Sequence, residues 1–140
     1  MPHEVRWKSD PEDHDYPAAA DYLGLITDPD HVETLVSRLR KAATVHRKAK
    51  DILRAAQLPL LPRDNVHVAH DLDKIDRGEA LSPILLVRGD LPAAARLEIA
   101  DGYHRVCASY YVDENTDIPC RLAARCATGR WPYPLTPAAR

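Results

Sequence analysis

The apolar residues of this 140-residue chain recur at spacings that predict both helices and strands. Between residues 29 and 42 they recur three and four positions apart, which predicts an amphipathic helix. Asp28 and Pro29 precede this run as a capping residue and as a proline suited to the first helical position. The pattern then predicts a strand over 44–48 and a short helix over 50–57.

The second half of the chain predicts a hairpin followed by a helix and another strand. A strand is predicted over residues 82–88, because Pro83 is followed by a continuous apolar run over 84–87, which is typical of a strand buried on both faces. A turn at 89–92 leads into a returning strand at 96–100. After a tight turn at Asp101 and Gly102, apolar spacing predicts a helix that begins near Tyr103. Residues 118–123 predict a further strand, in which Pro119 indicates an edge strand or a strand start.

One more helix is predicted to begin at Asp64 or Asn65, after an extended proline-containing loop, and to end at Gly78. Its apolar residues share one face, and the other face carries His67, His70, Asp71 and Lys74. These elements predict an α+β domain over residues 21–125, with a small mixed β-sheet flanked by helices. We expect residues 1–20 to form a flexible acidic arm and residues 126–140 a tail rich in proline and aromatic residues.

Charge is distributed unevenly, although the net formal charge is only −2. Residues 1–33 hold nine Asp and Glu against two basic residues, whereas residues 38–54 hold seven Lys and Arg against one Asp. The basic stretch has no interleaved aromatic residues, so we favour a solvated surface over a nucleic-acid contact, which stays open as the alternative. No apolar run has membrane length, no signal peptide is evident, and the three cysteines form no CxxC pair, so we expect a cytoplasmic protein with no membrane partner.

The start of the helix at Tyr103 is the strongest candidate for a binding site. A helix N-terminus presents unpaired backbone N–H groups and the positive end of the helix dipole, which together favour an anion. His104 and Arg105 lie in the first turn, where cations do not stabilise the helix dipole. They indicate that a negative ligand joins them, and the alternative is that both side chains point to solvent.

Several acidic and imidazole groups allow other chemistry. His67, His70 and Asp71 have the spacing of metal ligands on one helix, but no further ligand is evident, so we expect no metal bound by the protein. Asp101 could coordinate Mg²⁺ carried by a nucleotide or act as a base, or it could cap the following helix. Asp101 and His104 are the candidates for a catalytic base.

Three short motifs together resemble the ParB/sulfiredoxin-like superfamily. GEALSPILLVRG is similar to the glycine and proline-led buried strand of that family, and IADGYHRVCA is similar to the Gly-x-Arg-Arg box of ParB and the Gly-Cys-His-Arg box of sulfiredoxin. IPCRL is similar to the Ile-Pro strand that follows the box. Leu61-Pro62-Arg63 also looks like the Pro-Arg pair that precedes the second helix in ParB-type domains. The resemblance covers residues 48–122, about half of the chain.

The resemblance implies a nucleotide site, because the box holds the phosphates of ATP in sulfiredoxin and of CTP in ParB. We therefore expect a nucleotide triphosphate, ATP or CTP with Mg²⁺, or another small anion as the ligand. The function implied is that of a small NTPase or phosphotransferase, and the alternatives are a non-catalytic anion- or protein-binding module or a nucleic-acid-associated ParB-like protein. The residues expected around the ligand are Arg63, His67, His70, Lys74, Gly102, Tyr103, His104 and Arg105.

Two departures from the family narrow these expectations. Tyr103 stands where sulfiredoxin has its reactive cysteine, so we do not expect repair of sulfinic cysteine. Cys107, one helical turn later, is interpreted as a small buried hydrophobic residue. The DNA-reading helix-turn-helix that follows in ParB is absent from this sequence, so chromosome partitioning in the ParB manner is not expected.

Overall fold

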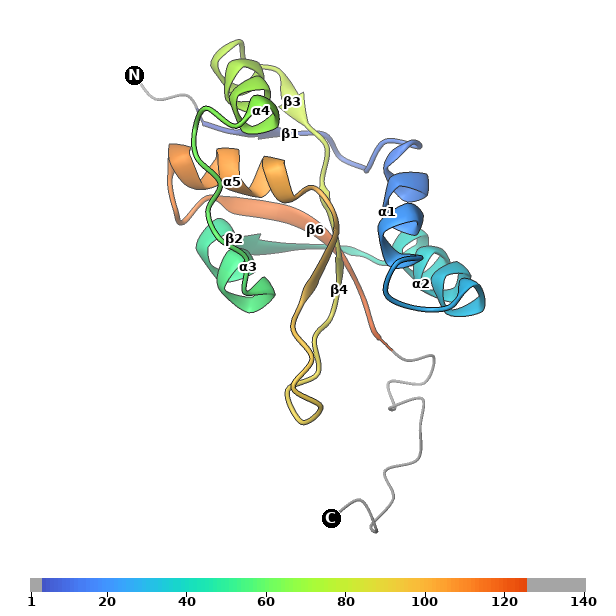
Figure 1. Ribbon diagram of the computed structural model, residues 1–140. Helices are drawn as coiled ribbons and strands as arrows, with labels where there is room; N and C mark the ends of the chain where they lie inside the picture. Colours follow the sequence, from blue (N-terminus) through green and yellow to red (C-terminus); the bar gives the residue numbers. More distant parts are fainter. Residues whose placement is uncertain (1–3, 126–140) are drawn as a thin grey trace.

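A four-stranded mixed sheet lies between two layers of helices in the computed structural model, which describes residues 4–125 (Figure 1). The strands lie in the order β2 (Thr44–Lys48), β6 (Asp117–Ala123), β4 (Ile84–Val87) and β5 (Glu98–Asp101). β6 is antiparallel to β2 and parallel to β4, and β4 is antiparallel to β5. The predicted α+β class is therefore confirmed.

β4 is the centre of the hydrophobic core because both of its faces are buried, as the sequence predicts. Ile84 and Leu86 face the layer formed by α3 (Ala49–Ala56), α4 (Val66–Asp76) and α5 (Tyr103–Val112). Leu85 and Val87 face the layer formed by α1 (Asp15–Leu23) and α2 (Pro29–Lys41). The period-2 alternation of a strand thus divides the core into two clusters, one on each side of the sheet.

The N-terminal segment belongs to the folded domain, so the prediction of a flexible arm over residues 1–20 is wrong for most of that stretch. β1 (Arg6–Trp7) pairs in parallel with β3 (Ala80–Leu81), and α1 begins at residue 15. Helix α1 buries Tyr16, Ala19 and Leu23 against α2 and the sheet. These residues recur three, four and seven positions apart, and Pro17 lies in the first turn of the helix, where a proline is tolerated.

Two other predictions about local structure are refined. Asn65, not Asp64, caps α4, and its side chain accepts hydrogen bonds from the backbone N–H groups of His67 and Val68. β6 is an internal strand, so the edge interpretation of Pro119 is wrong. Pro119 lies near the start of β6, one residue before the pairing with β4 begins at Cys120, so its missing N–H does not interrupt that ladder.

The remaining predicted elements agree with the structure within the usual variation of helix and strand ends. The predicted tail over residues 126–140 lies outside the described residues. Among the residues that the structure describes, no helix has both the length and the apolar character needed to cross a membrane.

Candidate functional site

Helix α5 begins immediately after β5, at a glycine whose backbone is left-handed. Gly102 has φ +114°, a conformation that L-residues other than glycine rarely adopt. A Cβ at this position would overlap Ile84 Cδ1 and would lie 2.9 Å from Arg105 Nη2. Packing therefore already requires glycine here, and the additional role of Gly102 in approaching a phosphate stays a prediction.

Arg105 links the first turn of α5 to the end of β5. Its Nη2 donates hydrogen bonds to Asp101 Oδ2 at 2.9 Å and to the carbonyl oxygen of Pro83 at 3.3 Å. Its Nε is buried and has no hydrogen-bond partner among the described residues. Burial raises the pKa of Asp101, although the neighbouring Arg105 guanidinium opposes this shift. Asp101 does not cap the helix, because the N-cap residue is Gly102.

Two imidazoles meet where α4 and α5 lie side by side. The ring centroids of His67 and His104 are 4.7 Å apart, and the ring of Tyr103 stacks against His104 with centroids 5.8 Å apart. Burial lowers the pKa of His104, and the nearby His67 lowers it further. The His104 ring is therefore neutral at neutral pH, with one nitrogen able to accept a hydrogen bond.

Asp71 connects the polar residues of the two helices electrostatically. Burial raises the pKa of its carboxyl group. The basic groups that act against this shift lie on both α4 and α5: Arg105, Lys74, His70 and His104. The polar face predicted for α4 therefore faces the start of α5.

Two of the predicted ligand-binding residues are engaged elsewhere. Arg63 donates to the carbonyl oxygen of Tyr111 at 3.5 Å, and its guanidinium lies 4.7 Å from the centroid of the Tyr111 ring. Tyr111 is at the far end of α5, roughly 12 Å along the helix from its first residue. The structure therefore does not bring Arg63 to Gly102. The hydroxyl group of Tyr103 donates to the carbonyl oxygen of Pro59 at 2.5 Å, so this tyrosine fixes the 58–63 loop.

Sequence reasoning missed a cluster that lies just before and at the start of α1. Asp15 is only 3% exposed, and its Oδ2 accepts hydrogen bonds from Ser82 Oγ and from the backbone N–H of Glu12. His14 lies beside both carboxylates. Asp15 and His14 both influence the pKa of Asp101, so the cluster is a neighbour of the Arg105 site. The helical spacing of Tyr16, Ala19 and Leu23 was the one available signal that this segment is folded.

The basic stretch over residues 38–54 is divided among α2, β2 and α3, and some of its charge is used within the molecule. Arg38 donates to the carbonyl oxygen of Ala124, and the guanidinium of Arg40 lies 4.2 Å from the Tyr16 ring centroid. Arg54 pairs with Asp51 on the surface of α3. The nucleic-acid interpretation of this stretch stays a prediction.

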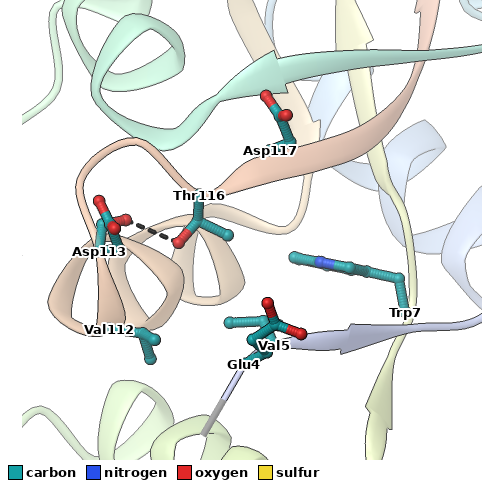
Figure 2. A pocket seen from close by; sticks show the side chains of 7 residues that line it. All are labelled: Glu4, Val5, Trp7, Val112, Asp113, Thr116 and Asp117. Carbon is teal, nitrogen blue, oxygen red and sulfur yellow. Dashed lines mark hydrogen bonds between the residues drawn. The ribbon is translucent and has the colours of Figure 1, made fainter. Parts of the chain in front are cut away.

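A hollow of about 450 Å³ lies between the N-terminal segment and the far end of α5 (Figure 2). Trp7 lines one side, and the loop after α5 lines the other, where Thr116 Oγ1 donates to the carbonyl oxygen of Asp113 at 2.7 Å. Glu4, Asp113 and Asp117 give the hollow three carboxylates. Their negative charge, together with the negative end of the α5 dipole, disfavours a phosphate there.

No protein-family model, curated protein or solved structure matches this chain. The comparisons therefore assign the chain to no family. The resemblance of its short motifs to the ParB/sulfiredoxin-like superfamily stays a prediction.

Proposed function

We propose that the protein binds a nucleotide or another phosphate-containing anion at the start of α5, within a ParB/sulfiredoxin-like fold. The observation that carries the proposal is the Nε of Arg105, a buried donor that has no acceptor among the described residues. A buried donor without an acceptor costs about 1–3 kcal/mol. A phosphate oxygen that reaches Nε would recover this cost and would lie near the positive end of the helix dipole.

Neighbouring residues on α4 support a ligand that touches both helices. His67 and His104 bring their rings together, and Lys74 is close enough to influence the pKa of Asp71. Imidazole and ammonium groups are suitable donors for phosphate oxygens. A ligand held by Lys74 and His104 would therefore be fixed by two separate helices.

The acidic residues at the site limit which anions fit. Asp101 already pairs with Arg105, and Asp71 adds a second carboxylate within electrostatic reach of the same guanidinium. A bare phosphate would be repelled by these groups. A nucleotide that carries Mg²⁺ brings its own positive charge, so we favour a magnesium–nucleotide complex over free phosphate.

Any reaction would depend mainly on positioning and electrostatic stabilisation, as in other phosphoryl transfers. Neutral His104 could accept a proton from an attacking water. Asp101 has a raised pKa, which favours general acid–base chemistry, but its pairing with Arg105 holds it in place. A non-catalytic anion-binding module would use the same groups, and release of inorganic phosphate from the bound nucleotide distinguishes the two functions.

The direct test is calorimetric titration of the full chain with ATP and with CTP, each with and without Mg²⁺. We expect binding of at least one magnesium nucleotide. Replacing Lys74 or His104 by Ala should weaken it about 10- to 100-fold, the effect of losing one charge-assisted hydrogen bond of about 1.5–3 kcal/mol.

Arg63→Ala is the matched control, because this arginine lies at the opposite end of α5 and should leave the affinity unchanged. If neither ATP nor CTP produces heat of binding, with or without Mg²⁺, the proposal is ruled out. Equal losses in Arg63→Ala and Lys74→Ala would move the site away from the start of α5.

A further inference from the structure

A further hollow, of about 210 Å³, lies between helix α3 and the sheet. Its apolar lining is formed by Ile52 of α3, Leu86 of β4, Leu122 of β6 and Leu97, which directly precedes β5. All four belong to the core cluster on the α3 side of the sheet, and Leu97 and Leu122 are only partly buried within it. The hollow is therefore a part of this core that side chains leave unfilled.

The short length of α3 explains why the hollow exists. Eight helical residues extend over about 12 Å, whereas the seven residues of β6 extend over about 23 Å. The helix is thus too short to cover the full length of the strand. Leu122, which lies near the end of β6, keeps an open side as a result.

The size of the hollow limits what can occupy it. A water molecule needs polar partners, whereas an apolar cavity of about 150 Å³ can hold benzene. Pockets for drug-sized ligands have volumes of about 300–1,000 Å³. A hollow of about 210 Å³ therefore suits a single ring or a short hydrocarbon chain, and it is too small for a peptide segment.

Two arginines add positive charge to this apolar lining. Arg88 follows Leu86 by two residues and Arg47 follows Val45 by two, so both lie on the α3 face of the sheet, and both line the hollow. Nη1 of Arg47 donates to the carbonyl oxygen of His46 at 2.8 Å, which leaves its other nitrogens available. The Arg88 side chain makes no hydrogen bond or ion pair among the described residues.

One acidic residue also lines the hollow, but its charge is compensated. Asp51 Oδ1 lies 3.3 Å from Nη2 of Arg54, the following arginine on α3. The two arginines of the lining therefore leave the hollow with a net positive charge. An apolar body beside unpaired guanidinium groups is the arrangement that complements an organic anion.

We propose that this hollow binds a small carboxylate with an apolar body, such as an aromatic acid or a short-chain aliphatic acid. The apolar body packs against the leucines, and the carboxylate accepts hydrogen bonds from a guanidinium, whose planar donors match its two oxygens. The inference goes beyond nucleotide binding and does not depend on it, because no residue of α5 lines the hollow.

The test is titration of the full chain with benzoate and with benzyl alcohol, a neutral molecule of similar shape, followed by amide NMR spectra. We expect benzoate to shift the amide resonances of Leu86, Leu97 and Leu122 and to bind more tightly than benzyl alcohol. Arg88→Gln should weaken the binding of benzoate about 2- to 10-fold, the effect of one solvent-screened charge, and should leave benzyl alcohol unchanged.

Two further variants separate the hollow from general effects of charge. Ala55→Leu places a larger side chain in the lining on α3 and should abolish binding of both molecules. Arg96→Gln is the matched control, because Arg96 is an exposed neighbour of Leu97 that does not line the hollow, so benzoate should bind as to the wild type. The arginine variants change exposed side chains, so they test the proposal even if Ala55→Leu fails to fold.

The inference is overturned if benzoate shifts none of the leucine resonances, or if benzoate and benzyl alcohol bind equally. Equal losses in Arg88→Gln and Arg96→Gln would assign the effect to net charge and not to this hollow. The outcome is separable from that of the proposed function. Benzoate binding by a protein that takes no nucleotide supports the hollow alone, and nucleotide binding without benzoate binding supports only the site at α5.

Discussion

Gly102 combines two structural demands, a left-handed backbone and close contact with neighbouring side chains. A comparison with Gly78 separates the two demands, because Gly102 and Gly78 both have positive φ, at +114° and +74°. The nearest atom to a Cβ at Gly78 would be Arg6 Nη1 at 3.9 Å, so only the backbone penalty applies there. At Gly102 the added methyl would also overlap Ile84.

We therefore expect Gly102→Ala to destabilise the protein more than Gly78→Ala. The backbone penalty is about 1–2 kcal/mol at each position, and overpacking adds about 1–3 kcal/mol at Gly102 alone. Urea unfolding followed by circular dichroism measures both variants. Equal losses would show that the contact of Gly102 with Ile84 is easily relieved.

At the scale of single elements, the sequence is compatible with either Asp64 or Asn65 as the N-cap of α4. Asn65 accepts two backbone N–H groups of the first turn, whereas Asp64 is exposed and does not cap. Replacing Asn65 by Ala should lower the free energy of unfolding by about 0.5–2 kcal/mol. Asp64→Ala, the control, should change it by less than about 0.5 kcal/mol. A larger effect at Asp64 would contradict the capping geometry.

Elements with a regular spacing of apolar residues were predictable from the sequence, and elements without such spacing were not. The helix at Pro29–Lys41 and the strand at Ile84–Val87 follow from apolar spacing alone. β1 has only two residues, too few for a period. In α1, Pro17 and the surrounding acids suggested a disordered segment, although the proline lies in the first helical turn.

The candidate site was likewise predictable only where it depends on local spacing and not on tertiary packing. The polar face of α4 could be selected from its helical spacing, but the contact between His67 and His104 depends on how two helices pack. Arg63 was assigned to the wrong end of α5, because the direction of the 58–63 loop is set by tertiary contacts with Tyr103 and Tyr111. The proximity of Asp15 to Ser82 joins segments 67 positions apart, which no local pattern reports.

At the scale of the whole molecule, Arg121 joins three segments that are distant in the sequence. Its guanidinium donates to the carbonyl oxygen of Ala42, to Thr44 Oγ1 and to Asp10 Oδ1. Arg121 is buried, whereas the Asp10 side chain is 77% exposed. The hydrogen bonds to the chain around residues 42–44 therefore contribute more than the ion pair, which water screens.

We expect Arg121→Met to lower the free energy of unfolding by about 1–3 kcal/mol, because the hydrogen bonds that the buried, charged guanidinium donates around residues 42–44 are lost. Asp10→Asn should lower it by less than about 1 kcal/mol, as for other exposed ion pairs. Thermal and urea unfolding of both variants provides the measurement. If Asp10→Asn is as damaging as Arg121→Met, the ion pair is the main connection.

The edge strand β2 has a consequence for how copies of the protein behave together. Its exposed residues His46, Arg47 and Lys48 follow one another along an open side of the four-stranded sheet. Two copies that approached through this side would bring arginine and lysine against arginine and lysine, and mutual repulsion would oppose continuation of the sheet from one molecule to the next. Crowded solutions of the protein should thus resist fibril growth through β2, and neutralising these two charges would remove that protection.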